Sequence, residues 1–249
     1  MGAALFVRTA RGVVPTPLGL RTAAGFTEAF DALGQAVQTL RAEAAPQVVH
    51  IATLPAIAQL WLSPRLPGLR VAAPEISVSI TALEAPPNLK RAPYDLCLFY
   101  GATGGTSLCA DVIFPVCTPQ IAALLPTPAD LATLPCLGDS AWGDDWAIWS
   151  ATAMPGALPV RGPVYPLYAL AVEVALNGAG VLIGHEALVA RHLASGALVA
   201  PFKVRVTLPR GLRLWTARPA PSKGAVDRVV QFLRGAGPSA PDPSRPISP

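Results

Sequence analysis

The sequence VVHIATLPAIAQLWLSPRLPGLRVAAPEISVSITAL, residues 48–83, decides the fold. The apolar run Val48–Ala52 predicts a buried strand, and the helix-like pattern of residues 55–69 is expected to end near Pro67–Gly68. Residues 76–83 then alternate between apolar and polar side chains, which is typical of a half-buried strand. Strands separated by helices predict an α/β fold with a parallel sheet covered by helices.

The same alternation of strands and helices continues through the rest of the chain. Further strands are expected at residues 95–100, 112–117, 134–137, 180–184 and 213–217. Helices are expected at residues 119–124, 168–177, 186–193 and 223–233, and residues 146–153 fit a short helix or a strand. These patterns predict two similar α/β units, one after the other.

The composition raises the question of a membrane protein, because 52% of the 249 residues are hydrophobic and only 14% are charged. A membrane-spanning helix needs about 20 apolar residues with few breaks. The longest uncharged runs, residues 96–110 and 112–129, are interrupted by glycines and prolines that such a helix would not tolerate. No apolar signal-peptide core follows Arg8 and Arg11. We therefore expect a cytoplasmic protein that does not bind a membrane.

The cysteines give no indication of a metal or redox site. Cys97, Cys109, Cys117 and Cys136 form no CxxC pair and have no histidine at ligand spacing, so they are interpreted as small core side chains. No motif of a nucleotide site, a nucleophile or a cofactor is found, and we expect no cofactor and no metal. The net charge of +4 permits a nucleic-acid partner without requiring one.

The N-terminal part predicts a long helix. Thr16 followed by Pro17 is typical of a helix start, and Pro46 would end the helix. Between them an apolar seam repeats in steps of four and three residues, at Phe26, Phe30, Leu33, Val37, Leu40 and Ala44. The seam could pack on the domain behind it or join two subunits. Its narrow, long shape favours a dimerisation helix.

Several motifs, taken in order, resemble one protein family. Residues 5–13 (LFVRTARGV) and 16–19 (TPLG) resemble the wing of LysR-type transcriptional regulators and the start of their linker helix. The body is similar to the glycine-cleavage-activator-like branch of that family in TLP at 53–55, WLSPRL at 61–66, PEI at 74–76, DL at 95–96, YG at 100–101, PVCTP at 115–119, ALNGAG at 175–180, ASG at 194–196 and PF at 201–202. The resemblance covers residues 5–234.

The resemblance implies two Rossmann-like lobes, of the type 2 periplasmic-binding-protein kind, after a long linker helix. The expected boundaries are residues 1–15 for a remnant of a winged helix-turn-helix, 16–45 for the linker and dimerisation helix and 46–236 for the effector-binding domain. Residues 237–249 are rich in Pro and Ser and poor in apolar side chains, so a disordered tail is expected there. Lobe I would take residues 46–115 and 206–236, and lobe II residues 116–205. The chain would cross between the lobes near Pro115–Val116 and Val204–Thr207.

The sequence departs from the family in two places. The helices that precede the wing, including the recognition helix, are not in these 249 residues, so a start codon upstream of Met1 is favoured over a natural or engineered fragment. Without those helices Arg8 and Arg11 would contact only DNA phosphates or the minor groove, which gives little specificity. Phe99 stands where relatives have an arginine before Tyr-Gly, which removes an expected ionic contact from the cleft.

A small ligand is expected where the strand ends of the two lobes face one another. The expected effector-binding residues are Thr53, Leu54, Pro55, Tyr100, Gly101, Ala102, Thr118, Pro119, Leu167 and Tyr168. Free amides at the helix start after Thr53 favour an anion, so a small carboxylate or an amino acid is predicted. Thr53 taken alone is better explained as a plain helix cap.

Other candidate residues have structural explanations that are at least as good. The tryptophans and aspartates of residues 142–149 could form an aromatic cage, although their spacing is more typical of helix packing. His185 follows a strand end and could face the cleft, cap a helix or face solvent. His50 is expected to be buried in a strand, and His192 to lie near a helix end.

The leading interpretation is the effector-sensing and dimerisation portion of a LysR-type regulator. A bound effector would close the lobes and re-orient paired DNA-binding modules. The partners would be a small effector, further copies in a homodimer or tetramer, and DNA if the missing helices exist. The alternative is a solute-binding protein of a transporter, which shares the two-lobed fold but needs an export signal. An enzyme is not expected, because the adjacent Asp144 and Asp145 make a poor acid–base pair.

Overall fold

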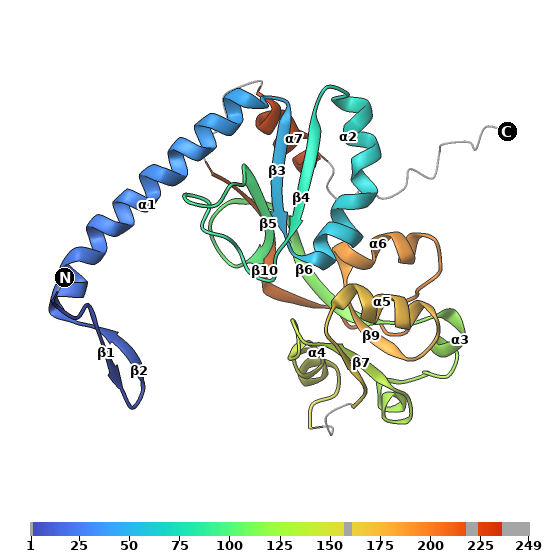
Figure 1. Ribbon diagram of the computed structural model, residues 1–249. Coiled ribbons are helices and arrows are strands. Elements are labelled where there is room, and N and C mark those ends of the chain that lie inside the picture. The colour runs from blue at the N-terminus through green and yellow to red at the C-terminus, as the bar shows by residue number, and fades with distance from the viewer. Residues whose placement is uncertain (1, 157–160, 218–223, 236–249) are drawn as a thin grey trace.

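The computed structural model describes residues 2–156, 161–217 and 224–235. Figure 1 shows a long N-terminal helix that leads into a body made of two α/β halves. The tail that was expected to be disordered, residues 237–249, lies outside the described residues. In the described part of the chain, no helix combines the length and the apolar character needed to cross a membrane.

The N-terminal part is a hairpin followed by the predicted helix. Strands β1 (Phe6–Thr9) and β2 (Gly12–Pro15) pair antiparallel. Helix α1 (Pro17–Ala44) begins after Thr16, whose hydroxyl accepts a hydrogen bond from the amide of Gly19 at 3.1 Å. The helix runs for 28 residues, which confirms the predicted start and end.

The body is built on one mixed sheet of eight strands in the order β4-β3-β5-β10-β6-β9-β7-β8. The strands are β3 (Val48–Thr53), β4 (Ser77–Ala82), β5 (Leu96–Gly101), β6 (Thr106–Val116), β7 (Cys136–Asp139), β8 (Val164–Tyr165), β9 (Val181–His185) and β10 (Val206–Thr216). Strand β10 runs antiparallel to β5 and to β6, and β6 runs antiparallel to β9. The α/β fold is as expected, but the sheet is mixed rather than parallel, because two long strands pass through its middle in opposite directions.

Two sets of helices divide the body into lobes (Figure 1). Lobe I is the half on β3, β4 and β5, and it carries the π-helix η1 (Ile57–Leu62), the 3-10 helix η2 (Ser63–Arg65), α2 (Leu66–Ala72) and α7 (Ala225–Gly235). Lobe II is the half on β7, β8 and β9, and it carries α3 (Pro119–Ala122), the 3-10 helix η3 (Pro128–Thr133), α4 (Asp145–Ala153), α5 (Tyr168–Leu176) and α6 (Glu186–Ala194). Strands β6 and β10 connect the two lobes.

The helix that was predicted to end near Pro67–Gly68 instead continues to Ala72. Pro67 is the second residue of α2, where a missing N–H has little effect because first-turn amides have no partner within a helix. A Cβ atom at Gly68 would lie 3.3 Å from the ring of Phe232 in α7. This packing of α2 against α7 lets the helix continue past the glycine.

The four cysteines are free thiols. Cys97, Cys117 and Cys136 are buried, as predicted for core side chains, and Cys109 is half-buried. Burial raises the pKa of Cys97 to about 11 and that of Cys136 to about 12, so these thiols are poor nucleophiles. Within the described ranges, no group of three or more His, Cys, Asp or Glu side chains could hold a metal ion.

A bulge marks the place where β10 passes between the lobes. The register against β6 shifts there, so that residues 208–210 lie opposite Asp111 alone. Pro209 is tolerated in the middle of the sheet because bulged residues do not donate to the ladder. The bulge turns Arg210 toward Asp111.

The predicted lobe boundaries at residues 115–116 and 205–206 remain predictions.

Candidate functional site

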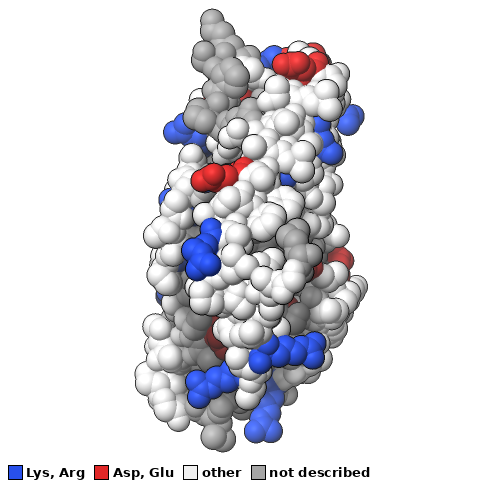
Figure 2. All heavy atoms as spheres, turned by 60° about the vertical axis from the view of Figure 1, so that its left-hand side comes forward, with Lys and Arg blue, Asp and Glu red and all other residues white. Residues whose placement is uncertain are grey.

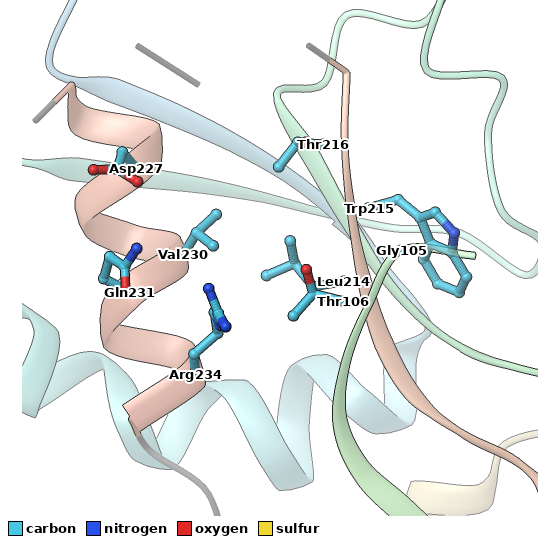
Figure 3. A pocket seen from close by; sticks show the side chains of 9 residues that line it. All are labelled: Gly105, Thr106, Leu214, Trp215, Thr216, Asp227, Val230, Gln231 and Arg234. Atoms are coloured by element: carbon cyan, nitrogen blue, oxygen red, sulfur yellow. The ribbon is translucent and has the colours of Figure 1, made fainter. Parts of the chain in front are cut away.

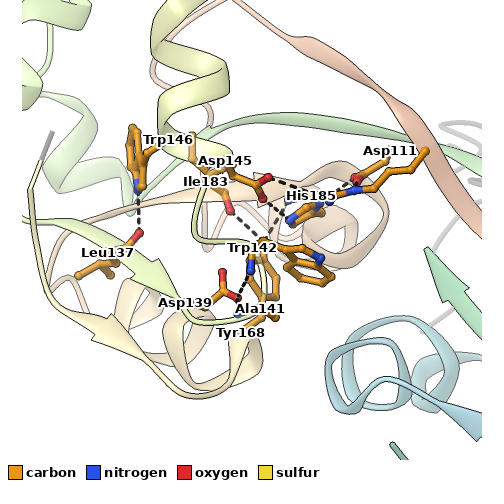
Figure 4. A network of polar contacts seen from close by, with 11 residues as sticks. Asp111, Leu137, Asp139, Ala141, Trp142, Asp145, Trp146, Tyr168, Ile183 and His185 are labelled. Carbon is orange, nitrogen blue, oxygen red and sulfur yellow. Dashed lines mark hydrogen bonds and ion pairs between the residues drawn. The ribbon is translucent and has the colours of Figure 1, made fainter. Parts of the chain in front are cut away.

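Four charged side chains meet where the lobes join. Asp111 comes from β6, Arg210 from the bulge of β10, His185 from the last position of β9 and Asp145 from the first position of α4. The side chains of Asp111 and His185 are completely buried, and that of Asp145 is 7% exposed. Figure 4 shows Asp111, Asp145 and His185 pointing toward one another. We call the four side chains the charged ring.

The charged ring is closed by four contacts. Both ring nitrogens of His185 face a carboxylate, because Nδ1 lies 2.7 Å from Asp111 Oδ1 and Nε2 lies 2.9 Å from Asp145 Oδ2. Arg210 bridges the same two carboxylates, with Nε 2.9 Å from Asp111 Oδ2 and Nη2 3.3 Å from Asp145 Oδ1. Nδ1 forms a hydrogen bond with Asp111, whereas Nε2 and Asp145 meet at ion-pair distance. Two carboxylates facing the two ring nitrogens favour the imidazolium form, with a proton on each nitrogen. With His185 as a cation, the ring holds two positive and two negative charges.

The electrostatics of the ring support that charge state. Burial alone would lower the pKa of His185, but the adjacent carboxylates of Asp111 and Asp145 outweigh burial and raise it. Burial would raise the pKa of Asp111, but hydrogen bonds from His185 and Arg210 hold it below the usual range. The charges of the two carboxylates are therefore neutralised within the ring, so the ring has no net charge at the junction of the lobes.

Aromatic side chains from both lobes cover the charged ring. The ring centre of Trp142 lies 4.1 Å from that of His185 and 4.9 Å from that of Tyr168 in lobe II, and 5.6 Å from that of Tyr100 in lobe I. The carboxylate of Asp139 fixes the loop that carries Trp142, because Oδ1 accepts hydrogen bonds from two successive amides, those of residues 141 and 142. Trp142 therefore contacts both lobes at once.

The two tyrosines differ in how their hydroxyl groups are used. The Tyr168 hydroxyl donates to the carbonyl of Ile183 and accepts from the amide of His185, both at 3.0 Å, so it is fully hydrogen-bonded to the backbone of β9. The Tyr100 hydroxyl is buried, and it has no hydrogen-bond partner among the residues that the structure describes. A buried polar group without a partner is uncommon in folded proteins. The Tyr100 hydroxyl is thus a group that a ligand can satisfy.

The structure brings together only some of the predicted site residues. Thr53 is completely buried, and its hydroxyl donates to the carbonyl of Leu98 at 2.9 Å. This hydrogen bond joins β3 to β5, so the hydroxyl proton is already engaged within the protein. Leu54 and Pro55 follow it at the same end of β3. Gly101 lies against Trp215, to which an added Cβ would come within 2.9 Å.

The remaining predicted residues are not members of the charged ring. Ala102 is exposed, and Leu167 is 42% exposed next to the buried Tyr168. Thr118 and Pro119 follow the end of β6 that pairs with the start of β9, whereas His185 ends β9. A five-residue strand spans about 13 Å between its ends, so Thr118 and Pro119 are not part of the cluster.

Sequence reasoning missed Asp111, Trp142, Asp145 and Arg210 as members of one site, and it left His185 undecided. One signal was present, because Asp111 is the single charge between Asp95 and Asp130. A lone aspartate within an apolar strand requires a buried partner. Phe99 lies in an apolar cluster with Ala52 and Cys97, so β5 offers no cation in place of the arginine expected from the resemblance.

A separate hollow of about 430 Å³ lies between α7 and β10 on lobe I. Figure 3 shows Leu214 and Arg234 pointing into it, while the ring of Trp215 points away. None of the predicted effector-binding residues lines this hollow.

Comparisons with known proteins agree with the resemblance seen in the sequence. The profile of the LysR substrate binding domain matches residues 42–238. The HTH-type transcriptional activator AmpR of Rhodobacter capsulatus is 30% identical over 241 residues, which cover 94% of this chain and 82% of that protein. The glycine cleavage system transcriptional activator of Escherichia coli K12 is 29% identical over 211 residues, covering 81% of this chain and 69% of that one. These relatives are regulators rather than enzymes or transport proteins.

Solved structures show the same fold. The effector domain of the transcriptional regulator AmpR of Pseudomonas aeruginosa superposes with a TM-score of 0.63 at 24% identity. The match covers 76% of this chain and 94% of that domain. It supports the predicted pair of α/β lobes.

Proposed function

The chain belongs to the LysR family of transcriptional regulators, most of it being the effector-binding domain, and we propose that it senses a small carboxylate between its lobes. The observation that carries this proposal is the buried Tyr100 hydroxyl without a partner in the described chain. It lies beside the charged ring, under Trp142, at the junction of the two lobes.

The groups at this junction suit an acceptor-rich ligand. Tyr100 offers a hydroxyl proton, and the guanidinium of Arg210 is 30% exposed and lies 5.9 Å from the ring centre of Trp142. Asp111 and Asp145 would repel an anion, but His185 and Arg210 already neutralise them. A carboxylate attached to a flat or apolar group would satisfy Tyr100 and pack on Trp142.

The proposed response is a shift between lobe arrangements. A ligand that contacts Tyr100 of lobe I and Trp142 of lobe II binds one spacing of the lobes better than others. The bulge at residues 208–210 is the place where β10 bends as the spacing changes. Only a ligand with different affinities for the two arrangements produces such a shift.

We further propose that α1 pairs with α1 of a second copy. The seam residues Phe26, Phe30, Leu33 and Leu40 are 57%, 56%, 61% and 67% exposed, although large apolar side chains at heptad spacing normally contact a partner. Members of this family bind DNA as multimers. Arg8 and Arg11 in the exposed hairpin are proposed to contact DNA phosphates, and Figure 2 shows Lys and Arg side chains gathered at the lower end of the face that carries α1.

The test is isothermal titration of the chain against a panel of metabolites, followed by variants. Tyr100→Phe removes only the unpartnered hydroxyl, and a lost hydrogen bond to a charged ligand should weaken binding about tenfold or more. Tyr94→Phe, in a half-buried tyrosine outside the cluster, is the matched control and should bind normally. Equal affinity in Tyr100→Phe and the wild type would contradict the proposed site.

A further inference from the structure

Helix α1 carries a second stripe beside its apolar seam. This stripe is shifted by one residue from the first five seam positions, so it repeats in the same steps of four and three. Its members are Thr27, Asp31, Gly34, Gln38 and Arg41. We call it the polar stripe. The apolar seam faces solvent, whereas the polar stripe faces the loop Asn88–Pro93 of lobe I.

The contacts of the polar stripe go mostly to the backbone of that loop. The side-chain amide of Gln38 donates to the carbonyls of Leu89 at 2.7 Å and Ala92 at 3.1 Å. Arg41 donates to the carbonyl of Pro93 at 3.1 Å. Near the other end of the stripe, Arg91 reaches back and pairs with Asp31 at 2.5 Å. These contacts run from Asp31 to Arg41, about three turns of the helix.

Gly34 lies where the loop comes nearest to the helix. A Cβ atom at this position would lie 2.5 Å from the carbonyl oxygen of Lys90 and 2.7 Å from the Cα of Arg91, which are both backbone atoms. No side chain can be accommodated there unless the loop moves away. Gly25, about two and a half turns earlier in the same helix, has no atom within 4 Å of such a Cβ. The close approach explains a helix-weakening residue at position 34.

The loop is in turn fixed to the sheet of lobe I. The amides of Arg91 and Ala92 both donate to the carbonyl of Asn88, which makes the loop a closed turn. On its inner side Leu89 packs with the apolar cluster around Phe99, the neighbour of Tyr100 in β5. The path from α1 to β5 therefore consists of packed and hydrogen-bonded groups throughout.

We propose that the polar stripe and the loop Asn88–Pro93 form a joint that holds α1 and lobe I as one rigid body. A change in lobe spacing then moves lobe II, while lobe I keeps its orientation relative to the dimerisation seam. The joint goes beyond the proposed effector site and does not depend on it, because it is complete without a ligand.

The test compares Gly34→Ala with Gly25→Ala. Helix propensity alone predicts that both substitutions raise the melting temperature. The joint predicts that only Gly25→Ala does so, and that Gly34→Ala increases amide hydrogen exchange in residues 88–93 by about tenfold. A Gly34→Ala variant that behaves like Gly25→Ala in both measurements would overturn the proposal.

A second variant covers the case in which Gly34→Ala folds poorly. Gln38→Ala removes two hydrogen bonds without adding an atom, and it should raise exchange in residues 88–93 while exchange in β9 stays unchanged. Protection of the loop should also be independent of protein concentration. Protection that disappears on dilution would show docking onto α1 of another copy and would contradict a joint within one chain.

Discussion

Replacing His185 with glutamine should destabilise the protein strongly, because it leaves two buried carboxylates with Arg210 as their single cation within the charged ring. The side chains of Asp111 and His185 are completely buried and that of Asp145 nearly so. Removing one partner of a buried ion pair typically lowers the free energy of unfolding by about 3–5 kcal/mol. Glutamine can donate to one carboxylate and recover about 1 kcal/mol, so the expected loss is about 3 kcal/mol.

The loss should also depend on pH in a defined direction. The pKa of His185 is raised above its unfolded value of 6.5, so its contribution is complete below that value and is lost as the pH rises through the folded pKa. The difference between the wild type and His185→Gln should therefore be largest near about pH 6 and smaller near about pH 9. At still lower pH, protonation of Asp111 in the variant should reduce the difference again.

Urea unfolding of both proteins at the two pH values measures this difference. His50→Gln is the control, since His50 is half-buried and lies outside the charged ring, and it should lose about 1 kcal/mol or less. The double variant His185→Gln with Asp145→Asn should regain part of the loss, because one unpaired charge is gone. A loss below about 1 kcal/mol in His185→Gln at the lower pH, or a difference that grows with pH, would refute the reasoning.

Two other substitutions test the surroundings of the site. Leu33→Asp places a charge in the exposed seam of α1 and should shift the chain from dimer to monomer in analytical ultracentrifugation. Thr22→Asp, outside the seam, is the control and should leave the dimer intact. A dimer that survives Leu33→Asp would contradict pairing through α1. Thr53→Val keeps the shape of the side chain but removes its hydrogen bond to the carbonyl of Leu98, and it should lower the free energy of unfolding by about 1 kcal/mol. An unchanged free energy of unfolding would show that this hydrogen bond does not stabilise the sheet.

The local elements could be predicted because their signals are short-range. The signal for the start of α1 lies within residues 16–19, where Thr16 caps the helix and Pro17 is its first residue. The heptad steps of the apolar residues mark the face of α1 that the structure leaves exposed. The family resemblance supplied the two lobes. The lengths of β6 and β10 were underestimated, since Pro209 and three glycines near residue 103 weaken the strand pattern locally.

The charged ring could not be predicted because its members are far apart in the sequence. Asp111, His185 and Arg210 meet only when two long strands cross between the lobes and a bulge turns one side chain inward. The expectation placed Thr118 near Tyr100 on topology alone, without knowing which end of β9 it would lie against. Register, rather than the type of element, decided which residues meet.

Tryptophan emission of the chain, titrated with a metabolite that binds in calorimetry, tests the central claim most directly. Trp142 contacts both lobes next to Tyr100 and His185, whereas Trp146 lies in α4 and donates to the carbonyl of Leu137. A ligand held between the lobes should change the emission of the wild type and of Trp146→Phe, and should leave that of Trp142→Phe unchanged. An emission change that persists in Trp142→Phe would place the ligand elsewhere and contradict the account.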